Sequence, residues 1–268
     1  MTLLIVIVSW NGRMDLERCL ASLADAPPAL THSIVVVDNG SEDGSADMVA
    51  ARYPAVGLIR SAENLGFARG NNLALREAQS DLILLLNPDT IVPAGAIDGL
   101  IGRLRAHPAA AAAGPRIIDG DGEPELSFGR MPTPVAEAWR KLTSRLHAAR
   151  VPPFPTLVRH MTARERLVDW VTGACLLVRR DRAEAVGFLD ERYRLYWEDV
   201  DFCTALRAKG WTILFTPAAQ IFHLRGRSAA SAPAAANKAY RDAQLAFYAK
   251  HQPQWAPFLR WYQRVRYD

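Results

Sequence analysis

The sequence of 268 residues has little cysteine and no long hydrophobic run, and each shortage excludes a class of protein. Its cysteines, Cys19, Cys175 and Cys203, have no paired spacing, so they predict neither a disulfide framework nor a zinc site and suggest a reducing cytoplasm. The longest apolar runs, 3–8 and 82–86, are far shorter than the roughly 18 residues that a membrane-spanning helix needs. The N-terminal stretch has no basic start and no A-x-A site, so we do not expect a signal peptide.

Several widespread catalytic signatures are also missing. The sequence has no G-x-G-x-x-G fingerprint, and the glycine-containing segment 64–72 lacks the G-K-[ST] end of a P-loop, so NAD-dependent enzymes and ATPases lose their main support. No Ser–His–Asp or Cys–His arrangement points to a protein nucleophile. Half of the residues are apolar and the net charge is only +4, which excludes a disordered chain and predicts a sizeable core.

Charge is unevenly distributed along the chain. Residues 1–129 have 9 basic and 16 acidic residues, a net charge of −7, whereas residues 130–182 carry +7. Residues 183–224 carry −2 and residues 225–268 carry +6. Basic segments favour anionic partners such as phosphates or acidic lipids, although solvated arginines on helix faces give the same composition. Nucleic-acid binding is disfavoured, because these segments contain no known recognition module.

Strand and helix patterns alternate through the first 118 residues. Aliphatic runs that predict strands buried in a sheet occupy 3–8, 33–38, 56–60, 82–86 and an Ala-rich stretch ending at 118. Helical spacing or capping residues predict helices over 16–23, 41–52, 73–79 and 94–106. The chain is therefore predicted to be α/β, with a Rossmann-like, mostly parallel sheet that has helices on both faces.

The alternation stops after residue 118. Because prolines interrupt residues 131–168, we expect a mobile excursion over the sheet with one helix, near 135–149. Beyond it we expect a strand over 168–179, a short helix over 182–186, a helix opened by 196–201 that runs to 209, a strand over 211–215 that leads to His223, and a partly helical tail. That tail interleaves Trp, Tyr and Phe with basic residues, so it would lie on an anionic membrane leaflet or pack on the protein or on a second subunit.

Polar residues stand where the predicted strands of the first half end. Ser9 and Asn11 follow the first strand, Asp38 ends the second, and Asn87 and Asp89 follow the fourth. Ligands of open parallel sheets bind at the carboxyl ends of the strands, so these ends predict a site, although Asp and Asn also cap helices. A nucleotide fits this set: Asp38 would accept hydrogen bonds from the base or ribose, and Asp89 would hold a divalent cation on a diphosphate.

One more candidate of the first half is Arg69, in the glycine-containing loop, which would contact the base or phosphate. A second group of candidate residues follows in the C-terminal half. Small residues in 172–174 (Thr172, Gly173 and Ala174) interrupt an apolar strand, as a backbone that lines a ligand would. Trp197, Glu198 and Asp199 lie at the start of a helix, where acids are also common as caps. His223 lies beside Arg225 and Arg227, which suggests the edge of an anion site.

Together these motifs resemble glycosyltransferase family 2, in particular its rhamnosyltransferase-like branch. The segments that carry the resemblance are 37–41, 64–72, 86–90, 172–174 and 197–201. The family implies a GT-A fold, a nucleotide-sugar donor, Mg²⁺ or Mn²⁺, and inversion at the anomeric carbon. Asp89 falls where the family has its D-x-D metal motif, of which only the last acid is kept, and His223 matches a metal-binding histidine. Asp199 falls where the family has its general base, with Glu198 as acceptor-binding or structural support.

The resemblance also implies a division of the chain and a substrate class. Residues 1–225 would form the GT-A domain, with 1–118 as the nucleotide-sugar half and 119–225 as the acceptor half, followed by the tail 226–268. The likeness favours dTDP-L-rhamnose as donor, with UDP-hexoses next, and a glycan or lipid-linked acceptor in cell-envelope polysaccharide synthesis. The enzyme would be cytoplasmic or peripheral at the inner face of the membrane.

Two other classes remain open. A sugar nucleotidyltransferase would need a longer Gly-rich loop with Lys or Arg after the first strand than 9–13 provides. A non-catalytic nucleotide- or membrane-binding module would keep Asp38 but would not need Asp199 and His223.

Overall fold

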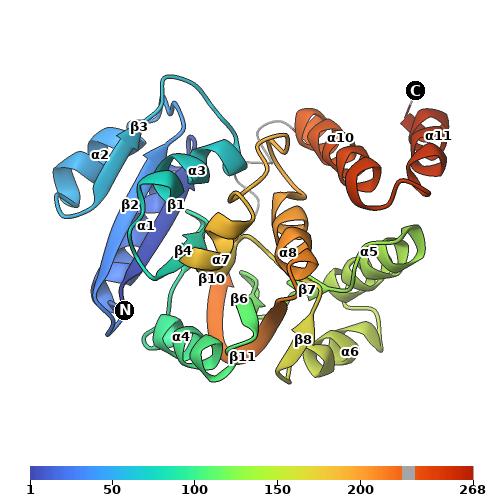
Figure 1. The fold of residues 1–268 in the computed structure, drawn as a ribbon, viewed down its shortest axis with the longest axis horizontal. Coiled ribbons are helices and arrows are strands. Elements are labelled where there is room, and N and C mark those ends of the chain that lie inside the picture. Colours follow the sequence, from blue (N-terminus) through green and yellow to red (C-terminus); the bar gives the residue numbers. More distant parts are fainter. Residues whose placement is uncertain (225–232, 268) are drawn as a thin grey trace.

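The computed structural model describes residues 1–224 and 233–267. Its N-terminal half is a parallel sheet in the order β3-β2-β1-β4, made of β1 (Leu3–Ser9), β2 (His32–Asp38), β3 (Gly57–Arg60) and β4 (Leu82–Leu86). The connecting helices are α1 (Arg13–Asp25), α2 (Ser45–Arg52) and α3 (Phe67–Glu77). Figure 1 shows this half as the blue and cyan part of the ribbon. The predicted parallel arrangement places the polar ends of β1, β2 and β4 at one edge.

The C-terminal half extends the same sheet with strands of both directions. β10 (Cys175–Arg179) runs antiparallel between β4 and β6 (Ala110–Ile118), and β11 (Thr212–His223) pairs in parallel with β6. Short antiparallel strands, β5 (Thr90–Ile91) and β8 (Arg166–Val168), flank β11, and a separate pair joins β7 (Phe128–Gly129) to β9 (Trp170–Val171). The α/β class and the mainly parallel sheet with helices on both faces, which the sequence predicts, are confirmed.

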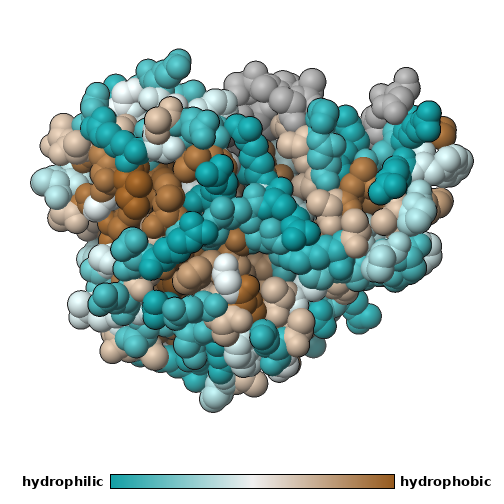
Figure 2. Space-filling model, turned by 45° about the horizontal axis from the view of Figure 1, so that its top comes forward, coloured by the Kyte–Doolittle hydropathy of each residue, from teal (hydrophilic) through white to brown (hydrophobic). Residues whose placement is uncertain are grey.

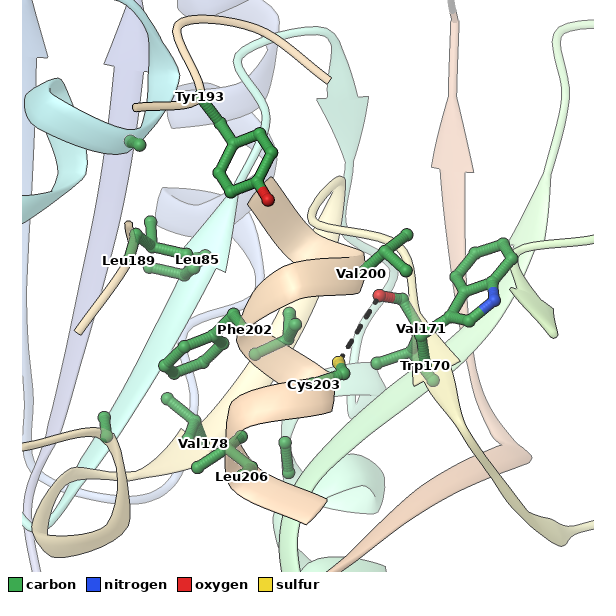
Figure 3. Packing of buried hydrophobic residues seen from close by; sticks show 14 of the residues in the cluster. Leu85, Trp170, Val171, Val178, Leu189, Tyr193, Val200, Phe202, Cys203 and Leu206 are labelled. Atoms are coloured by element: carbon green, nitrogen blue, oxygen red, sulfur yellow. Dashed lines mark hydrogen bonds between the residues drawn. The ribbon is translucent and has the colours of Figure 1, made fainter. Parts of the chain in front are cut away.

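Each face of the sheet is covered by its own hydrophobic layer. Successive residues of a strand point to opposite faces, so Ile5 and Ile7 of β1 pack with α1, α2 and α4 (Ala96–Ala106), while Val6 and Val8 pack with α3 and α8 (Glu198–Ala208). Figure 3 shows the second layer, in which Phe202 and Leu206 of α8 lie against Leu85 and Val178 of the sheet. In the space-filling view, hydrophilic residues cover much of the visible face and hydrophobic ones gather over the N-terminal half (Figure 2).

Several predicted boundaries are wrong. The helix expected over 73–79 begins at Phe67, the strand expected over 168–179 is broken at 172–174, and β11 continues to His223 instead of ending at 215. Residues 131–168 contain two helices, α5 (Pro134–Ala148) and α6 (Phe154–Met161), where one was expected. The short helix expected from 182 is α7 (Arg180–Ala185).

The tail forms two helices, α10 (Pro233–His251) and α11 (Ala256–Tyr267). α10 packs on the body, where its Phe247 and Tyr248 are fully buried in the layer that also holds Val6. Figure 1 shows α5, α10 and α11 together on the side of the molecule away from α2. No helix in the described part of the chain is long and apolar enough to cross a membrane.

Candidate functional site

A cleft of about 1640 Å³ opens at the carboxyl ends of β1, β2 and β4 and extends to α5 and α8. Most of the residues that the sequence singles out line it: Asn87, Asp89, Thr172, Gly173, Ala174, Trp197, Glu198, Asp199 and His223. The strand ends therefore meet as the topology predicts, and they face residues from the C-terminal half across one cavity.

The donor candidates Ser9 and Asp38 are buried and are not among the residues that line the cleft. They are paired in the register of β1 and β2, and the Asn39 N–H donates to the Ser9 carbonyl at 2.8 Å. Asp38 Oδ2 accepts from the Ser41 N–H at 3.1 Å, but Asp38 Oδ1 and Ser9 Oγ are buried with no hydrogen-bond partner among the described residues. Asp38 is 4% exposed, so it is a buried strand-end carboxylate with one oxygen still to be satisfied.

The other two donor candidates are placed differently. Asn11 has φ 49° and ties the ends of β1 and β2 together: its N–H donates to Ser41 Oγ at 3.0 Å and its Oδ1 accepts from the Glu42 N–H at 2.8 Å. Arg69 is exposed on α3, with its guanidinium 3.7 Å from the Glu191 carboxylate. Neither Asn11 nor Arg69 is among the residues that line the described cleft. Asn11 therefore shapes the strand ends, and the structure does not bring Arg69 into the cavity.

Asn39 is a cleft residue that the sequence analysis did not single out. Its Nδ2 donates to the Gly66 carbonyl at 3.1 Å, and its Oδ1 accepts from the Leu65 N–H at 3.2 Å. Gly66, at φ +83°, lies against the loop before α8: the Phe67 N–H donates to the Arg194 carbonyl at 2.8 Å. A Cβ on Gly66 would lie 2.3 Å from that carbonyl oxygen, so only glycine fits where the two halves meet.

Asp89 and His223 converge at the base of the cleft. β5 and β11 pair His223 with Thr90, and the Leu224 N–H donates to the Asp89 carbonyl at 2.9 Å. As a result, His223 Nε2 lies 3.1 Å from Asp89 Oδ1 and 3.4 Å from the amide nitrogen of Asn87. The Asn87 N–H also donates a hydrogen bond to the Ala174 carbonyl at 2.9 Å. This bond holds Asn87, Asp89 and His223 beside the break between β9 and β10.

This pair fits a divalent cation that a diphosphate also holds. Carboxylate and imidazole are both ligands of Mn²⁺, and Mg²⁺ favours the carboxylate. His223 Nδ1 is buried and finds no partner within the described chain, so the ring's polar atoms are not used up by the fold. Groups of three or more His, Cys, Asp or Glu side chains suited to a metal are absent from residues 1–224 and 233–267, so phosphate oxygens and waters would complete the coordination.

Glu198 and Asp199, the acid pair, lie at the N-terminus of α8 after a strained turn. Tyr196 and Trp197 have φ of 70° and 69°, which is costly for non-glycine residues and aims the next two side chains into the cleft. Asp199 Oδ2 accepts from the Gly173 N–H at 2.9 Å, and its Oδ1 accepts from the Val200 N–H at 2.8 Å. Gly173 is close-packed here, because a Cβ would lie 3.4 Å from both Asp199 Cβ and the Phe67 ring.

The surroundings distinguish the two acids. Burial raises the pKa of Glu198 well above its usual range, and the neighbouring Asp199 charge raises it further. Burial also raises the pKa of Asp199, but the Gly173 and Val200 N–H groups and the Arg140 charge oppose it. Glu198 Oε2 is buried with no partner in the described residues. Asp199 is therefore the better stabilised of the two as a carboxylate, because two backbone N–H groups and the Arg140 charge oppose the effect of its burial.

The cleft wall formed by the C-terminal half includes α5, which the motif analysis passed over. Trp139 and Arg140 of α5 line the cleft, and the Arg140 guanidinium lies 5.5 Å from the centre of the Trp170 ring. The +7 charge of residues 130–182 is the only sequence signal that pointed to this wall. Arg225 and Arg227, expected beside His223, lie outside the described residues.

Comparisons with known proteins agree with this geometry. The model of the family described as "Glycosyl transferase family 2" matches residues 4–173. An N-acetylglucosaminyl-diphospho-decaprenol L-rhamnosyltransferase of Mycobacterium tuberculosis is 33% identical over 96% of this chain and 87% of its own length. The low-salt glycan biosynthesis hexosyltransferase Agl10 of Haloferax volcanii is 24% identical over 78% of this chain and 62% of its own.

Solved structures share the fold at low sequence identity. The mannosyltransferase PcManGT of Pyrobaculum calidifontis, in complex with GDP-Man and Mn²⁺, is 17% identical with a TM-score of 0.63, over 96% of this chain and 68% of that one. GalNAc-T7 with UDP, GalNAc and Mn²⁺ is 16% identical with a TM-score of 0.62, over 84% of this chain and 44% of that one. With the family match and the rhamnosyltransferase relative, the chain belongs to glycosyltransferase family 2, as a GT-A glycosyltransferase of the rhamnosyltransferase-like branch.

Proposed function

We propose that the protein transfers L-rhamnose from dTDP-L-rhamnose to a lipid-linked N-acetylglucosamine acceptor, with inversion, in cell-envelope polysaccharide synthesis. The mycobacterial relative supports this substrate class, because its name states an L-rhamnosyl donor group and an N-acetylglucosaminyl-diphospho-decaprenol acceptor. The single observation in the chain itself that carries the proposal is the ionisable Asp199, held by two backbone N–H groups at the wall of a cleft whose floor holds Asp89 and His223.

The proposed reaction is one displacement at the anomeric carbon. The acceptor hydroxyl oxygen forms a bond to C1 while the bond from C1 to the diphosphate oxygen breaks, and the electron pair leaves with the nucleoside diphosphate. Asp199 takes the hydroxyl proton as general base. Each Asp199 oxygen accepts one N–H, which leaves a lone pair for that hydroxyl and fixes the carboxylate in place. No protein nucleophile is needed.

Donor binding would fall to the first half of the chain. Asp38 Oδ1 and Ser9 Oγ are buried with no partner in the described residues and stand outside the cleft lining, so the nucleoside would reach them beside Asn39, which does line the cleft. Asp89 and His223 would hold Mn²⁺ or Mg²⁺, which supplies positive charge to the diphosphate when it is bound. The proposed division of residues 1–118 for donor and 119–225 for acceptor then has one exception, because His223 serves the donor.

A donor panel tests the proposal. Purified protein is incubated with dTDP-L-rhamnose, UDP-glucose or UDP-N-acetylglucosamine, an N-acetylglucosaminyl-diphospho-lipid, and Mn²⁺ or EDTA. We expect dTDP release and an acceptor heavier by one deoxyhexose, only with dTDP-L-rhamnose and metal. Product formed only from a UDP-sugar would replace the proposed donor. Binding of nucleotide without product from any sugar would favour the non-catalytic module.

Three variants separate the proposed roles. Asp89→Ala and His223→Ala should each weaken metal-dependent binding of dTDP, measured by calorimetry with and without Mn²⁺. Asp38→Asn should weaken dTDP binding in both conditions, because its contact is to the nucleoside. Full activity of the unchanged protein in EDTA would contradict both metal ligands.

A further inference from the structure

Helix α11 exposes the face that an amphipathic helix normally buries. Its buried residues are Ala256, Leu259 and Gln263. The exposed ones include most of its large apolar side chains, and Trp261 and Val265 are 60% and 69% exposed. We call this exposed set the α11 stripe: Phe258, Trp261, Tyr262 and Val265.

The stripe is continuous along one side of the helix. Its members are spaced i, i+3, i+4 and i+7, the positions that share one face at 3.6 residues per turn. Trp255, just before the helix, is also exposed, and the Phe258 and Trp261 rings lie 6.0 Å apart. Aromatic side chains gathered in one stripe differ from the scattered apolar residues of an ordinary surface.

Hydrogen bonds fix this orientation. Gln263 Nε2 donates to Gln244 Oε1 at 2.9 Å and to the Arg241 carbonyl at 3.3 Å, both on α10. The polar Gln263 is thus held against the body, and rotating the helix to bury the stripe would break both bonds. The outward direction of the rings is therefore a specified feature of the fold.

The charge around the stripe has one sign. Residues 243–267 contain Lys250, Arg260, Arg264 and Arg266 and no Asp or Glu. Arg260 and Arg264 are exposed on α11 itself. A two-fold interface between copies would bring this surface against itself and oppose like charges. An anionic partner with an apolar interior complements both the rings and the arginines.

A second apolar row stands on α5, at the mouth of the cleft. Val135, Trp139 and Leu142 are exposed at spacing i, i+4, i+7, and Trp139, 56% exposed, also lines the cleft. α5 is tied to α10 through Glu137, and α10 to α11 through Gln263, so the two rows belong to one cluster of helices (Figure 1).

We propose that the α11 stripe, with its flanking arginines, docks the protein on an anionic lipid bilayer and sets the cleft mouth at the membrane surface. Trp and Tyr favour the headgroup region, and arginines beside them attract acidic lipids. The purpose of this docking, access to a lipid-linked acceptor, rests on the proposed function. Lipid binding itself depends neither on the donor nor on the reaction.

Vesicle flotation tests the proposal. Purified full-length protein is mixed with vesicles of phosphatidylcholine alone or with about a third phosphatidylglycerol, at low and high salt. We expect flotation with the anionic vesicles, reduced by salt because exposed charges are screened. The double variant Trp261→Ser/Val265→Ser should lose at least ten-fold in vesicle affinity, and Arg260→Gln/Arg264→Gln should lose the dependence on phosphatidylglycerol. Met14→Ser is the matched control, since Met14 is 59% exposed on α1.

Two flotation results would overturn the proposal. Absence of flotation, or equal flotation of the unchanged protein and the stripe variant, means that the stripe is not a lipid surface. A dimer by sedimentation that the stripe variant abolishes, without flotation, assigns the stripe to a second copy. Thermal unfolding and turnover of a water-soluble acceptor analogue should be unchanged in all variants, because none touches the cleft. Failure of turnover in the unchanged protein would refute the proposed function while leaving a positive flotation result standing.

Discussion

Replacing Gly66 by alanine tests the contact that joins the two halves of the cleft. Gly66 has φ 83° and ψ 177°, a region that is essentially restricted to glycine, so alanine costs about 1–3 kcal/mol there. Its Cβ would also lie 2.3 Å from the Arg194 carbonyl oxygen and 2.7 Å from Arg194 Cγ. Because the first of these is backbone, the loop before α8 has to move.

That movement breaks two hydrogen bonds. The Phe67 N–H donates to the Arg194 carbonyl at 2.8 Å, and Arg194 Nη2 donates to the Asn64 carbonyl at 3.0 Å. At about 1 kcal/mol for each bond, the total loss for Gly66→Ala is roughly 3–5 kcal/mol. Asn64 and Gly66 line the cleft, so the KM for the donor should also rise.

Gly95→Ala is the matched control for this measurement. Gly95 also precedes a helix with positive φ, 75°, but a Cβ there meets nothing within 4 Å. It should cost only about 1–2 kcal/mol, the price of the left-handed conformation alone, and leave the donor KM unchanged. Urea unfolding followed by circular dichroism gives both free energies. Equal losses in the two variants would refute the assignment of Gly66 to a close contact between the halves.

Three further predictions concern the acids. Arg140→Gln should move the acidic limb of the pH–rate profile to higher pH, because the Arg140 charge lowers the pKa of Asp199, which must be ionised to act; an unmoved limb would separate the two residues. Glu137→Ala should lower the free energy of unfolding by about 3–5 kcal/mol in urea titrations, since this buried carboxylate accepts from Tyr240, Gln244 and Tyr248 and pairs with Lys141; a loss below 1 kcal/mol would contradict it. Glu198→Gln should raise the Tm relative to the unchanged protein increasingly as pH rises above about 4.5, because a raised pKa means that the folded state binds the proton more tightly and loses stability as pH rises; parallel Tm curves would argue against a buried protonated Glu198.

The strand-end part of the site could be predicted from sequence because it depends on local pattern and topology. Buried aliphatic runs that stop at Ser9, Asp38 and Asp89 specify parallel strands, and parallel strands bring their carboxyl ends to one edge. That Asp89 and His223 lie close together was predicted only through the resemblance to the family. In the structure, the pairing of β5 with β11, strands far apart in sequence, brings the two side chains together.

The errors share a physical cause, which is stabilisation by partners distant in sequence. The helix expected from residue 73 begins at Phe67 because Asn72, a residue typical of loops, is buried and donates to the Leu189 carbonyl at 2.8 Å. Prolines suggested an irregular segment around α6, yet Pro155 occupies its first turn, where a missing N–H costs nothing. The roles of Asn39 and Arg140 depend in the same way on loops and helices that only the folded chain brings to the cleft.

Transfer kinetics of Asp199→Asn test the central claim most directly. With dTDP-L-rhamnose, Mn²⁺ and a lipid-linked acceptor, the account predicts a kcat lower by about 10²- to 10⁴-fold, the usual contribution of a general base, and an unchanged Kd for dTDP. Glu198→Gln, measured beside it, should retain more activity, because burial raises the pKa of Glu198 and so favours its protonated form, which cannot take up the hydroxyl proton. A near-normal kcat for Asp199→Asn together with a large loss for Glu198→Gln would contradict the assignment of Asp199 as the base of an inverting glycosyltransferase.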